Sequence, residues 1–259
     1  MKSFANTRVL VTGAGVRIGR QIALQFAQAG ATVVVHYHQS EESARDLLAQ
    51  LNAISSGHEM VRADLLVDAE RERLIPDLTG SGRRLNCLVN NASVYRRCQL
   101  ANVISESLRE DFLINFEAPF LLMRDFAQFC EEGNIINILD QRVANVDPSA
   151  GTYGFAKKSL RDATEAAAVQ WAPRIRVNAV APGIVLAPPG LAPEKIERLI
   201  KYVPMGQRST PDEIAEACLF LAQAETITGQ IIYVDGGLHL VGPDLQEPDD
   251  AHYSGSNDC

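Results

Sequence analysis

The sequence has no cluster of lysine or arginine, no long apolar run and no paired C-x-x-C cysteines. Its net charge is −8, so a nucleic-acid surface, which depends on clustered positive charge, is not expected. The first apolar run is short and is broken by Gly13 and Gly15, which argues against a signal peptide or a membrane span. The five cysteines are scattered and odd in number, which is typical of reduced thiols, and we expect a cytoplasmic protein.

Short apolar strands alternate with amphipathic helices along most of the 259 residues. The predicted strands are 8–12, 31–37, 59–63, 86–90, 134–139, 174–180 and 230–234. The predicted helices are 18–28, 40–54, 68–78, 105–130, 153–171 and 212–222. Continuously apolar strands separated by helices indicate a Rossmann-type, doubly wound α/β fold, with a parallel sheet covered on both faces. We expect one domain over residues 1–241, and the polar, acidic stretch 242–259 is predicted to be a disordered tail.

Ligands of such a sheet bind beyond the carboxyl ends of the strands, where the first strand leads into Thr12-Gly13-Ala14-Gly15-Val16-Arg17-Ile18-Gly19. Glycines let the backbone approach a pyrophosphate, and the N–H groups that begin the next helix face the anion. The usual G-x-G-x-x-G spacing is missing, because Ile18 stands where the third glycine is expected. The pattern predicts a dinucleotide site at Gly13, Gly15, Arg17 and Ile18, with a simple glycine-rich turn as the alternative.

No acidic residue stands at the end of the second strand, which reads His36-Tyr37-His38-Gln39-Ser40. A carboxylate there holds the ribose of NAD and would repel a 2′-phosphate, so its absence permits NADP. His38, Ser40 and Arg17 are candidate donors to that phosphate, unless the histidines are ordinary surface residues. The predicted cofactor residues of this region are His36, Tyr37, His38, Ser40 and, beyond the third strand, Asp64 and Leu65, with Asp64 placed to accept from the adenine amine.

The fourth and fifth strands end in polar residues. Asn91, Ala92 and Ser93 follow the fourth strand and are predicted to line the dinucleotide. Asp140 follows the fifth strand and should face the same crevice, although a helix-capping or solvated aspartate is the alternative.

Tyr153 and Lys157 are four residues apart on a predicted helix and therefore share one face. A phenol has an ordinary pKa of about 10, and a nearby ammonium favours the phenolate. The spacing therefore predicts a tyrosine tuned for proton transfer.

Five segments, TGAGVRIG, NNAS, YGFAK, RVNAVAPG and VDGG, together resemble the short-chain dehydrogenase/reductase family in order and spacing, from Thr7 to Leu240. The resemblance implies a seven-stranded parallel sheet in the order 3-2-1-4-5-6-7, a homotetramer, and hydride transfer involving a nicotinamide ring. It implies that Tyr153 donates the proton and that Lys157 binds the nicotinamide ribose. It further implies that Asn115 supports a relay water and that Pro182, Gly183 and Ile184 lie beside the carboxamide.

Within that family, the chain is similar to the pteridine reductases. Asp140 stands where most members have serine, Arg17 stands where most have glycine, and the segments NNAS and HYH also match. This resemblance implies NADPH-dependent reduction of a ring C=N in a small-molecule pterin. Asp140, with a pKa raised by burial, would donate or relay the proton together with Tyr153, and as a carboxylate it could also accept from the pterin amino group.

The same resemblance implies the other substrate contacts. Tyr95 would stack on the pterin, and Ser93 and Arg17 would contact pterin polar atoms and cofactor phosphate. Gln39 departs from the pattern, because a basic residue often stands there to bind the 2′-phosphate.

Two other functions stay open on the sequence. One is a carbonyl or 3-oxoacyl reductase that has lost the serine. The other is a non-catalytic dinucleotide-binding regulator, which would not need Tyr153, Lys157 and Asn115. No metal site is predicted.

Overall fold

The sheet of this computed structural model has seven parallel strands in the order β3-β2-β1-β4-β5-β6-β7, which confirms the predicted fold class and strand order. The structure describes residues 4–80, 82–186 and 193–241, and the tail predicted over 242–259 lies outside them. The strands are β1 (Arg8–Val11), β2 (Thr32–Tyr37), β3 (Glu59–Arg62), β4 (Cys87–Asn90), β5 (Gly133–Ile138), β6 (Ile175–Pro182) and β7 (Ile231–Val234).

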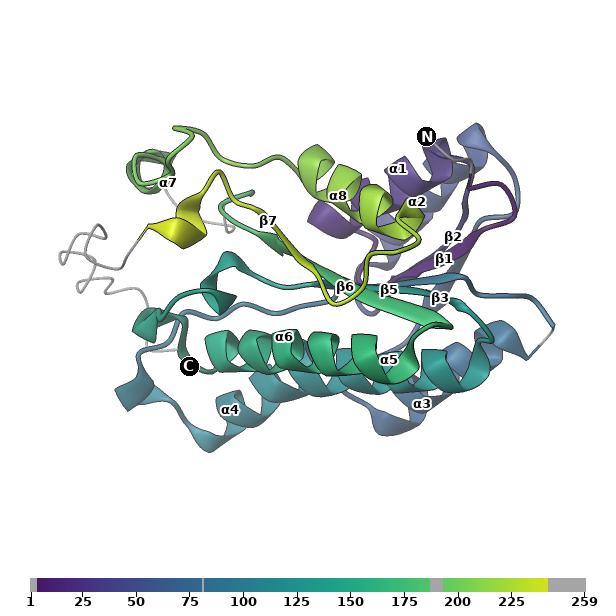
Figure 1. The fold of residues 1–259 in the computed structure, drawn as a ribbon, viewed down its shortest axis with the longest axis horizontal. Coiled ribbons are helices and arrows are strands. Elements are labelled where there is room, and N and C mark those ends of the chain that lie inside the picture. The colour runs from purple at the N-terminus through teal and green to yellow at the C-terminus, as the bar shows by residue number, and fades with distance from the viewer. Residues whose placement is uncertain (1–3, 81, 187–192, 242–259) are drawn as a thin grey trace.

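Helices cover both faces of the sheet, so each face has its own apolar core. One face packs against α1 (Arg17–Gln28), α2 (Glu41–Ile54) and α8 (Pro211–Gln223), and the other against α3 (Asp68–Thr79), α4 (Ser105–Phe112), α5 (Ala118–Phe129) and α6 (Gly151–Trp171) (Figure 1). Phe26 is fully buried in the first core, and Phe126 is fully buried in the second. A further helix, α7 (Pro193–Ile200), falls in a segment where the sequence predicted no helix.

The helical stretch predicted over 105–130 is confirmed from Ser105 to Phe129, but the hydrogen-bond pattern changes within it. The chain forms α4, then a π-helical turn at Leu113–Glu117, and then α5. Pro119 explains the wide turn, because it has no N–H to donate to the carbonyl of Asn115, four residues earlier. Such single wide turns are frequent at functional sites, and this one holds the buried Asn115.

Three of the cysteines are buried free thiols, as predicted: Cys87, Cys130 and Cys218. The prediction of reduced thiols is wrong for Cys98, which is disulfide-bonded. Among the described residues, no helix is long and apolar enough to cross a membrane.

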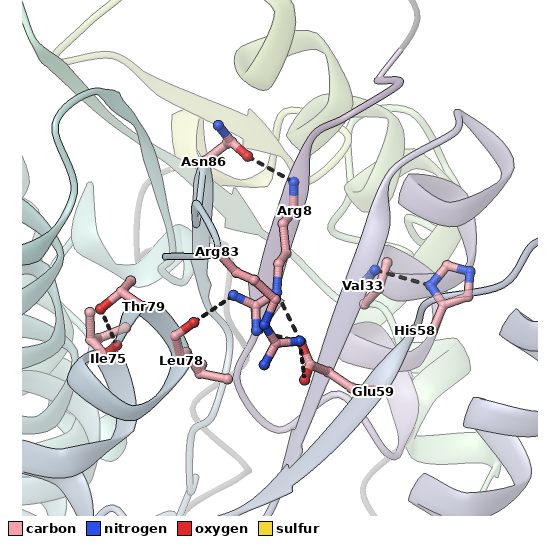
Figure 2. A network of polar contacts seen from close by, with 9 residues as sticks. All are labelled: Arg8, Val33, His58, Glu59, Ile75, Leu78, Thr79, Arg83 and Asn86. Carbon is pink, nitrogen blue, oxygen red and sulfur yellow. Dashed lines mark hydrogen bonds and ion pairs between the residues drawn. The ribbon is translucent and has the colours of Figure 1, made fainter. Parts of the chain in front are cut away.

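The amino-terminal edge of the sheet is held together around a buried arginine. Arg8 donates through Nε to Glu59 Oε1 (2.9 Å) and through a terminal nitrogen to the Leu78 carbonyl (2.7 Å), while its backbone N–H bonds Asn86 Oδ1 (2.9 Å) (Figure 2). Arg83 also reaches Glu59, at 3.1 Å. These contacts link β1, β3 and α3 at the edge opposite the carboxyl ends of the strands.

Replacing Glu59 by glutamine should leave the buried Arg8 guanidinium without its charged partner. We expect the free energy of unfolding, measured by urea titration, to fall by about 1–3 kcal/mol. Asp77→Asn is the control, because the Arg73–Asp77 ion pair of α3 is exposed. Equal losses in the two variants would contradict this account of the edge.

Candidate active site

The loops that follow β1 and β4 are bound to each other by Thr12 and Asn91. The Thr12 hydroxyl accepts from the backbone N–H groups of Asn91 (2.9 Å) and Ala92 (3.0 Å). The Asn91 side chain donates in return to the carbonyls of Thr12 (2.9 Å) and Gly13 (3.2 Å). These bonds fix the glycine loop against the end of β4. No role was predicted for Thr12, although this residue stands directly before the glycine turn.

The glycine that the helix needs for close packing is Gly19, not a residue at position 18. A Cβ at Gly19 would lie 2.5 Å from Asn91 Nδ2 and 2.5 Å from the Gly13 carbonyl, so only glycine fits. A Cβ at Gly13 (φ +61°) would lie 3.1 Å from Ala92 Cα. The G-x-G-x-x-G spacing predicts the third glycine at Ile18, and here the spacing is one residue longer.

Arg17 begins α1 in a backbone conformation that is rare for a side-chain-bearing residue, with φ +54°. Its guanidinium donates to the Leu186 carbonyl at 3.3 Å, which connects the glycine loop to the segment after β6. The preceding residue, Val16, has no polar side chain to cap the helix. The first N–H groups of α1 are therefore suited to an anion.

His36 is a buried brace for the glycine loop. Its Nδ1 accepts from the Gly13 N–H at 3.1 Å, and its Nε2 lies 3.1 Å from the Ala63 carbonyl. Burial lowers the pKa of His36 to about 4, so the ring is neutral at physiological pH. His36 thus contributes to the predicted cofactor region by positioning Gly13.

The other residues predicted after β2 and β3 lie at the same edge of the sheet. A Cβ at Gly15 would lie 2.9 Å from the Ser40 hydroxyl, so the serine faces the glycine loop. His38 Nε2 lies 3.4 Å from Asp64 Oδ2. Two more of the predicted residues, Tyr37 and Leu65, are buried.

Asn115 connects the π turn to the loop after β4. Its side-chain oxygen accepts from the Ser93 hydroxyl (2.6 Å) and the Val94 N–H (3.3 Å), and its amide donates to the Val94 carbonyl (2.9 Å). The structure therefore brings together two residues, Ser93 and Asn115, that lie far apart in the sequence.

Tyr153, Lys157 and Asp140 meet at the end of β5. The Tyr153 hydroxyl donates to Asp140 Oδ2 at 3.1 Å, and Lys157 Nζ donates to the Ile138 carbonyl at 2.8 Å. Tyr153 and Lys157 are both buried on one face of α6. The carboxylate and the phenol are thus in direct contact.

The predicted lowering of the Tyr153 pKa by Lys157 is wrong for this structure. Burial, and next the Asp140 carboxylate, raise the pKa of Tyr153 well above 10. Burial lowers the pKa of Lys157 to about 8. The Lys157 ammonium lies 5.8 Å from the centre of the tyrosine ring and bonds a backbone carbonyl, while the phenol itself bonds a carboxylate.

Arg142 is the main residue of this site that the sequence analysis missed. Its backbone N–H donates to Asp140 Oδ1 at 2.9 Å, so Asp140 caps the 3₁₀ turn Gln141–Val143. The Arg142 guanidinium also bonds Asp140 Oδ2 (3.1 Å) and, through Nε, Asp147 Oδ2 (2.7 Å). The capping alternative for Asp140 is therefore correct, and it holds together with the position beside Tyr153.

Tyr95 lies over these residues. Its ring packs edge-on against Tyr153, with centroids 4.9 Å apart, and the Arg142 guanidinium lies 5.3 Å from its centroid. Tyr95 is 40% exposed, so a large part of its surface remains open to a ligand.

The end of β6 reaches the same region. The Gly183 N–H bonds the Val234 carbonyl at 3.0 Å, and a Cβ at Gly183 would lie 2.6 Å from the Asp235 Cβ. Pro182 ends β6, and the Ile184 carbonyl accepts from Ser209 at 3.0 Å. Residues 187–192 of the following segment lie outside the described residues.

The sequence profile of the family described as enoyl-(acyl carrier protein) reductase matches residues 13–239. The chain is also 31% identical over 239 residues to the 3-oxoacyl-[acyl-carrier-protein] reductase FabG of Staphylococcus aureus, a match that covers 89% of this chain and 97% of the relative.

Two solved structures are similar to this chain over nearly its whole length. One is the FolM alternative dihydrofolate reductase 1 from Brucella canis complexed with NADP, with a TM-score of 0.86, 31% identity, and coverage of 95% of this chain and 100% of that chain. The other is its counterpart from Brucella suis in complex with NADP, with a TM-score of 0.87, 31% identity, and coverage of 94% and 98%.

The neutral, buried state of His36 has a consequence for stability. The pKa of His36 is about 4 when folded and 6.5 in the reference state, so the unfolded chain binds a proton first as the pH falls. The contribution of His36 is complete above pH 6.5 and is lost as the pH falls towards 4, by about 3 kcal/mol in all.

We therefore expect His36→Gln to flatten the dependence of unfolding free energy on pH between 7 and 4.5, measured by urea titration. The other histidines are common to both proteins and cancel in the comparison. A pH dependence identical to that of the unsubstituted protein would show that His36 is not the neutral brace described.

Proposed function

The chain belongs to the short-chain dehydrogenase/reductase family, and we propose that within it this protein is an NADPH-dependent reductase of a pterin ring. The observation that carries the proposal is the direct bond between Tyr153 and Asp140 beneath the exposed ring of Tyr95. A planar heterocycle that stacks on an aromatic ring and presents N–H groups to a carboxylate fits this arrangement.

The residues of the predicted cofactor region support the proposal that NADPH is the cofactor. The glycine cradle and the uncapped start of α1 suit a pyrophosphate, and Arg17, His38 and Ser40 supply polar groups where no carboxylate ends β2. Both Brucella structures are named as complexes with NADP. The residues proposed to hold the cofactor are Gly13, Gly15, Arg17, Ile18, His36, Tyr37, His38, Ser40, Asp64, Leu65, Asn91, Ala92, Ser93, Tyr153, Lys157, Pro182, Gly183 and Ile184.

NADPH, when bound, supplies the hydride. The chain's own residues would then orient the substrate and deliver the proton. Tyr95 would stack on the ring, Ser93 and Arg17 would bond its polar atoms, and Asp140 would accept from its N–H groups. Tyr153 would protonate the ring nitrogen, with Lys157 on the same helix face and Asn115 holding Ser93.

The names of the Brucella neighbours favour a pterin or a folate as substrate, because both are called alternative dihydrofolate reductases. The relative named 3-oxoacyl reductase keeps a second candidate open, which is reduction of a carbonyl group. No contact among the described residues of the site favours a non-catalytic binding role. Tyr153, Lys157 and Asp140 lie together at the end of β5, as a catalytic role requires.

We also propose a homotetramer in the cytoplasm. Large apolar side chains lie exposed on α4, α5 and α6, namely Leu108 (40%), Phe120 (38%), Phe155 (50%) and Val169 (82%). α4 and α5 both pack against α6, so these side chains lie on neighbouring helices, where we propose the subunit contact.

Paired steady-state kinetics test the proposal. We expect NADPH to be oxidised with a dihydropterin or dihydrofolate, at a higher kcat/KM than NADH, because no carboxylate repels the 2′-phosphate. No oxidation above background, with turnover of a ketone or 3-oxoacyl substrate instead, would establish the carbonyl reductase. Cofactor binding by calorimetry without turnover on either class would establish the regulator.

Exchanging Asp140 for serine distinguishes the two candidate activities, which are reduction of a pterin ring and reduction of a carbonyl group. We expect Asp140→Ser to lower kcat/KM for the dihydropterin by about 10- to 10²-fold, because the carboxylate that accepts from the substrate N–H groups is lost, while reduction of ketones is unchanged or improved. Tyr153→Phe is the matched variant, because it removes the proposed donor and should lower both activities. Retention of pterin turnover in Asp140→Ser would contradict the role of the carboxylate.

A further inference from the structure

Arg142 lies between two carboxylates. It bonds Asp140 Oδ2 at 3.1 Å and Oδ1 at 3.2 Å on one side, and Asp147 Oδ2 at 2.7 Å on the other. Its side chain is 29% exposed, while those of Asp140 and Asp147 are 16% and 13% exposed. The flat guanidinium also lies over the ring of Tyr95. An arginine fixed by two acids and one aromatic ring has little freedom to leave Asp140.

The contacts of Asp140 define what its oxygens do. Oδ1 accepts from the Arg142 backbone N–H and from the guanidinium, and Oδ2 accepts from the guanidinium and from the Tyr153 hydroxyl. A backbone N–H and a guanidinium can only donate hydrogen bonds. The three contacts with Arg142 therefore each require a carboxyl oxygen that accepts. The arrangement fits a carboxylate and does not fit a carboxylic acid ready to give a proton.

We propose that Arg142 is a positioning residue that holds Asp140 as an ionised acceptor, which leaves Tyr153 as the group that gives the proton to the substrate. This inference rests on the proposed reduction of a ring C=N. Of the two roles that the family resemblance implies for Asp140, it favours the acceptor of substrate N–H groups over the proton donor.

The step balances with one donor. The hydride forms the new C–H bond at the ring carbon, and the π electron pair of the C=N bond moves to the nitrogen. The nitrogen takes the hydroxyl proton of Tyr153, and the phenolate regains a proton from water. Asp140 neither gains nor loses a proton. It accepts a hydrogen bond from the Tyr153 hydroxyl before substrate binds, and hydrogen bonds from substrate N–H groups afterwards.

The charges around Asp140 set the expected effect of pH. Arg142 faces it from the 3₁₀ turn, Tyr153 and Lys157 face it from α6, and Tyr95 faces it from the loop after β4, with Asp147 behind Arg142. Lys157 is buried and bonds the Ile138 carbonyl. Loss of the Arg142 charge removes the cation that bonds the carboxylate directly, so Asp140 should take up a proton at higher pH.

The test compares Arg142→Gln, Arg142→Lys and the surface control Arg73→Gln by kcat/KM for a dihydropterin from pH 5 to 9. We expect the acidic limb of the Arg142→Gln profile to move to higher pH by about 1–3 units, with partial recovery in Arg142→Lys and no change in Arg73→Gln. If Asp140 were the donor, Arg142→Gln would instead be as fast or faster near pH 7. Such a result, or an acidic limb that does not move, overturns the inference.

A second readout is independent of turnover. The ¹³C signal of the Asp140 carboxyl, assigned with Asp140→Asn, is followed against pH in protein labelled at aspartate. We expect its titration midpoint to be higher in Arg142→Gln than in the unsubstituted protein, and equal midpoints would overturn the inference. If the unsubstituted protein turned over no dihydropterin, the proposed function would fail, while this titration would still decide the role of Arg142.

Discussion

The bond between Tyr153 and Asp140 depends on how the parallel sheet ends. β5 finishes at Ile138, two residues before Asp140, and α6 starts at Gly151, two residues before Tyr153. The chain between them turns back through the 3₁₀ turn that Asp140 itself caps. Because all seven strands are parallel, the loops after β1, β4 and β6 open at the same edge. The residues proposed to hold the cofactor, to contact the substrate and to donate the proton therefore share one region because of strand direction.

The loops and side chains of the candidate site are held in place by hydrogen bonds from polar side chains around them. His36 and Asn91 hold the glycine loop through Gly13, and Thr12 holds the loop after β4. Asn115 holds Ser93 from the π turn. Arg142, which is itself held by Asp147, holds Asp140 in the same way. Each of these braces is a polar side chain with its partners supplied, which is the condition under which buried polar groups make a site rigid.

The fold and most of the edge residues could be predicted because they depend on local pattern. Short apolar β-branched runs bounded by turn residues and separated by helices indicate strands, and the residues that follow each strand lie at its carboxyl end. Arg142 could not be predicted in this way, because its contacts with Asp140, Asp147 and Tyr95 depend on a 3₁₀ turn and on a loop from another part of the chain. The pKa of Tyr153 was mispredicted for a related reason. Helix spacing gave the distance to Lys157, but it contained no information on burial or on the carboxylate that bonds the phenol. The π turn at Leu113–Glu117 did have a local signal, Pro119, which the apolar periodicity of the helix obscured.

The central claim is that hydride reaches a ring carbon of a pterin while this site supplies the proton. The most direct measurement is a reaction with NADPH deuterated at the transferring position and a dihydropterin, with the product analysed by NMR and mass spectrometry. The account predicts a tetrahydropterin with one deuterium on the ring carbon of the former C=N bond, and no such product from Tyr153→Phe. An unlabelled pterin, together with deuterium on the carbinol carbon of a competing ketone or 3-oxoacyl substrate, would contradict it.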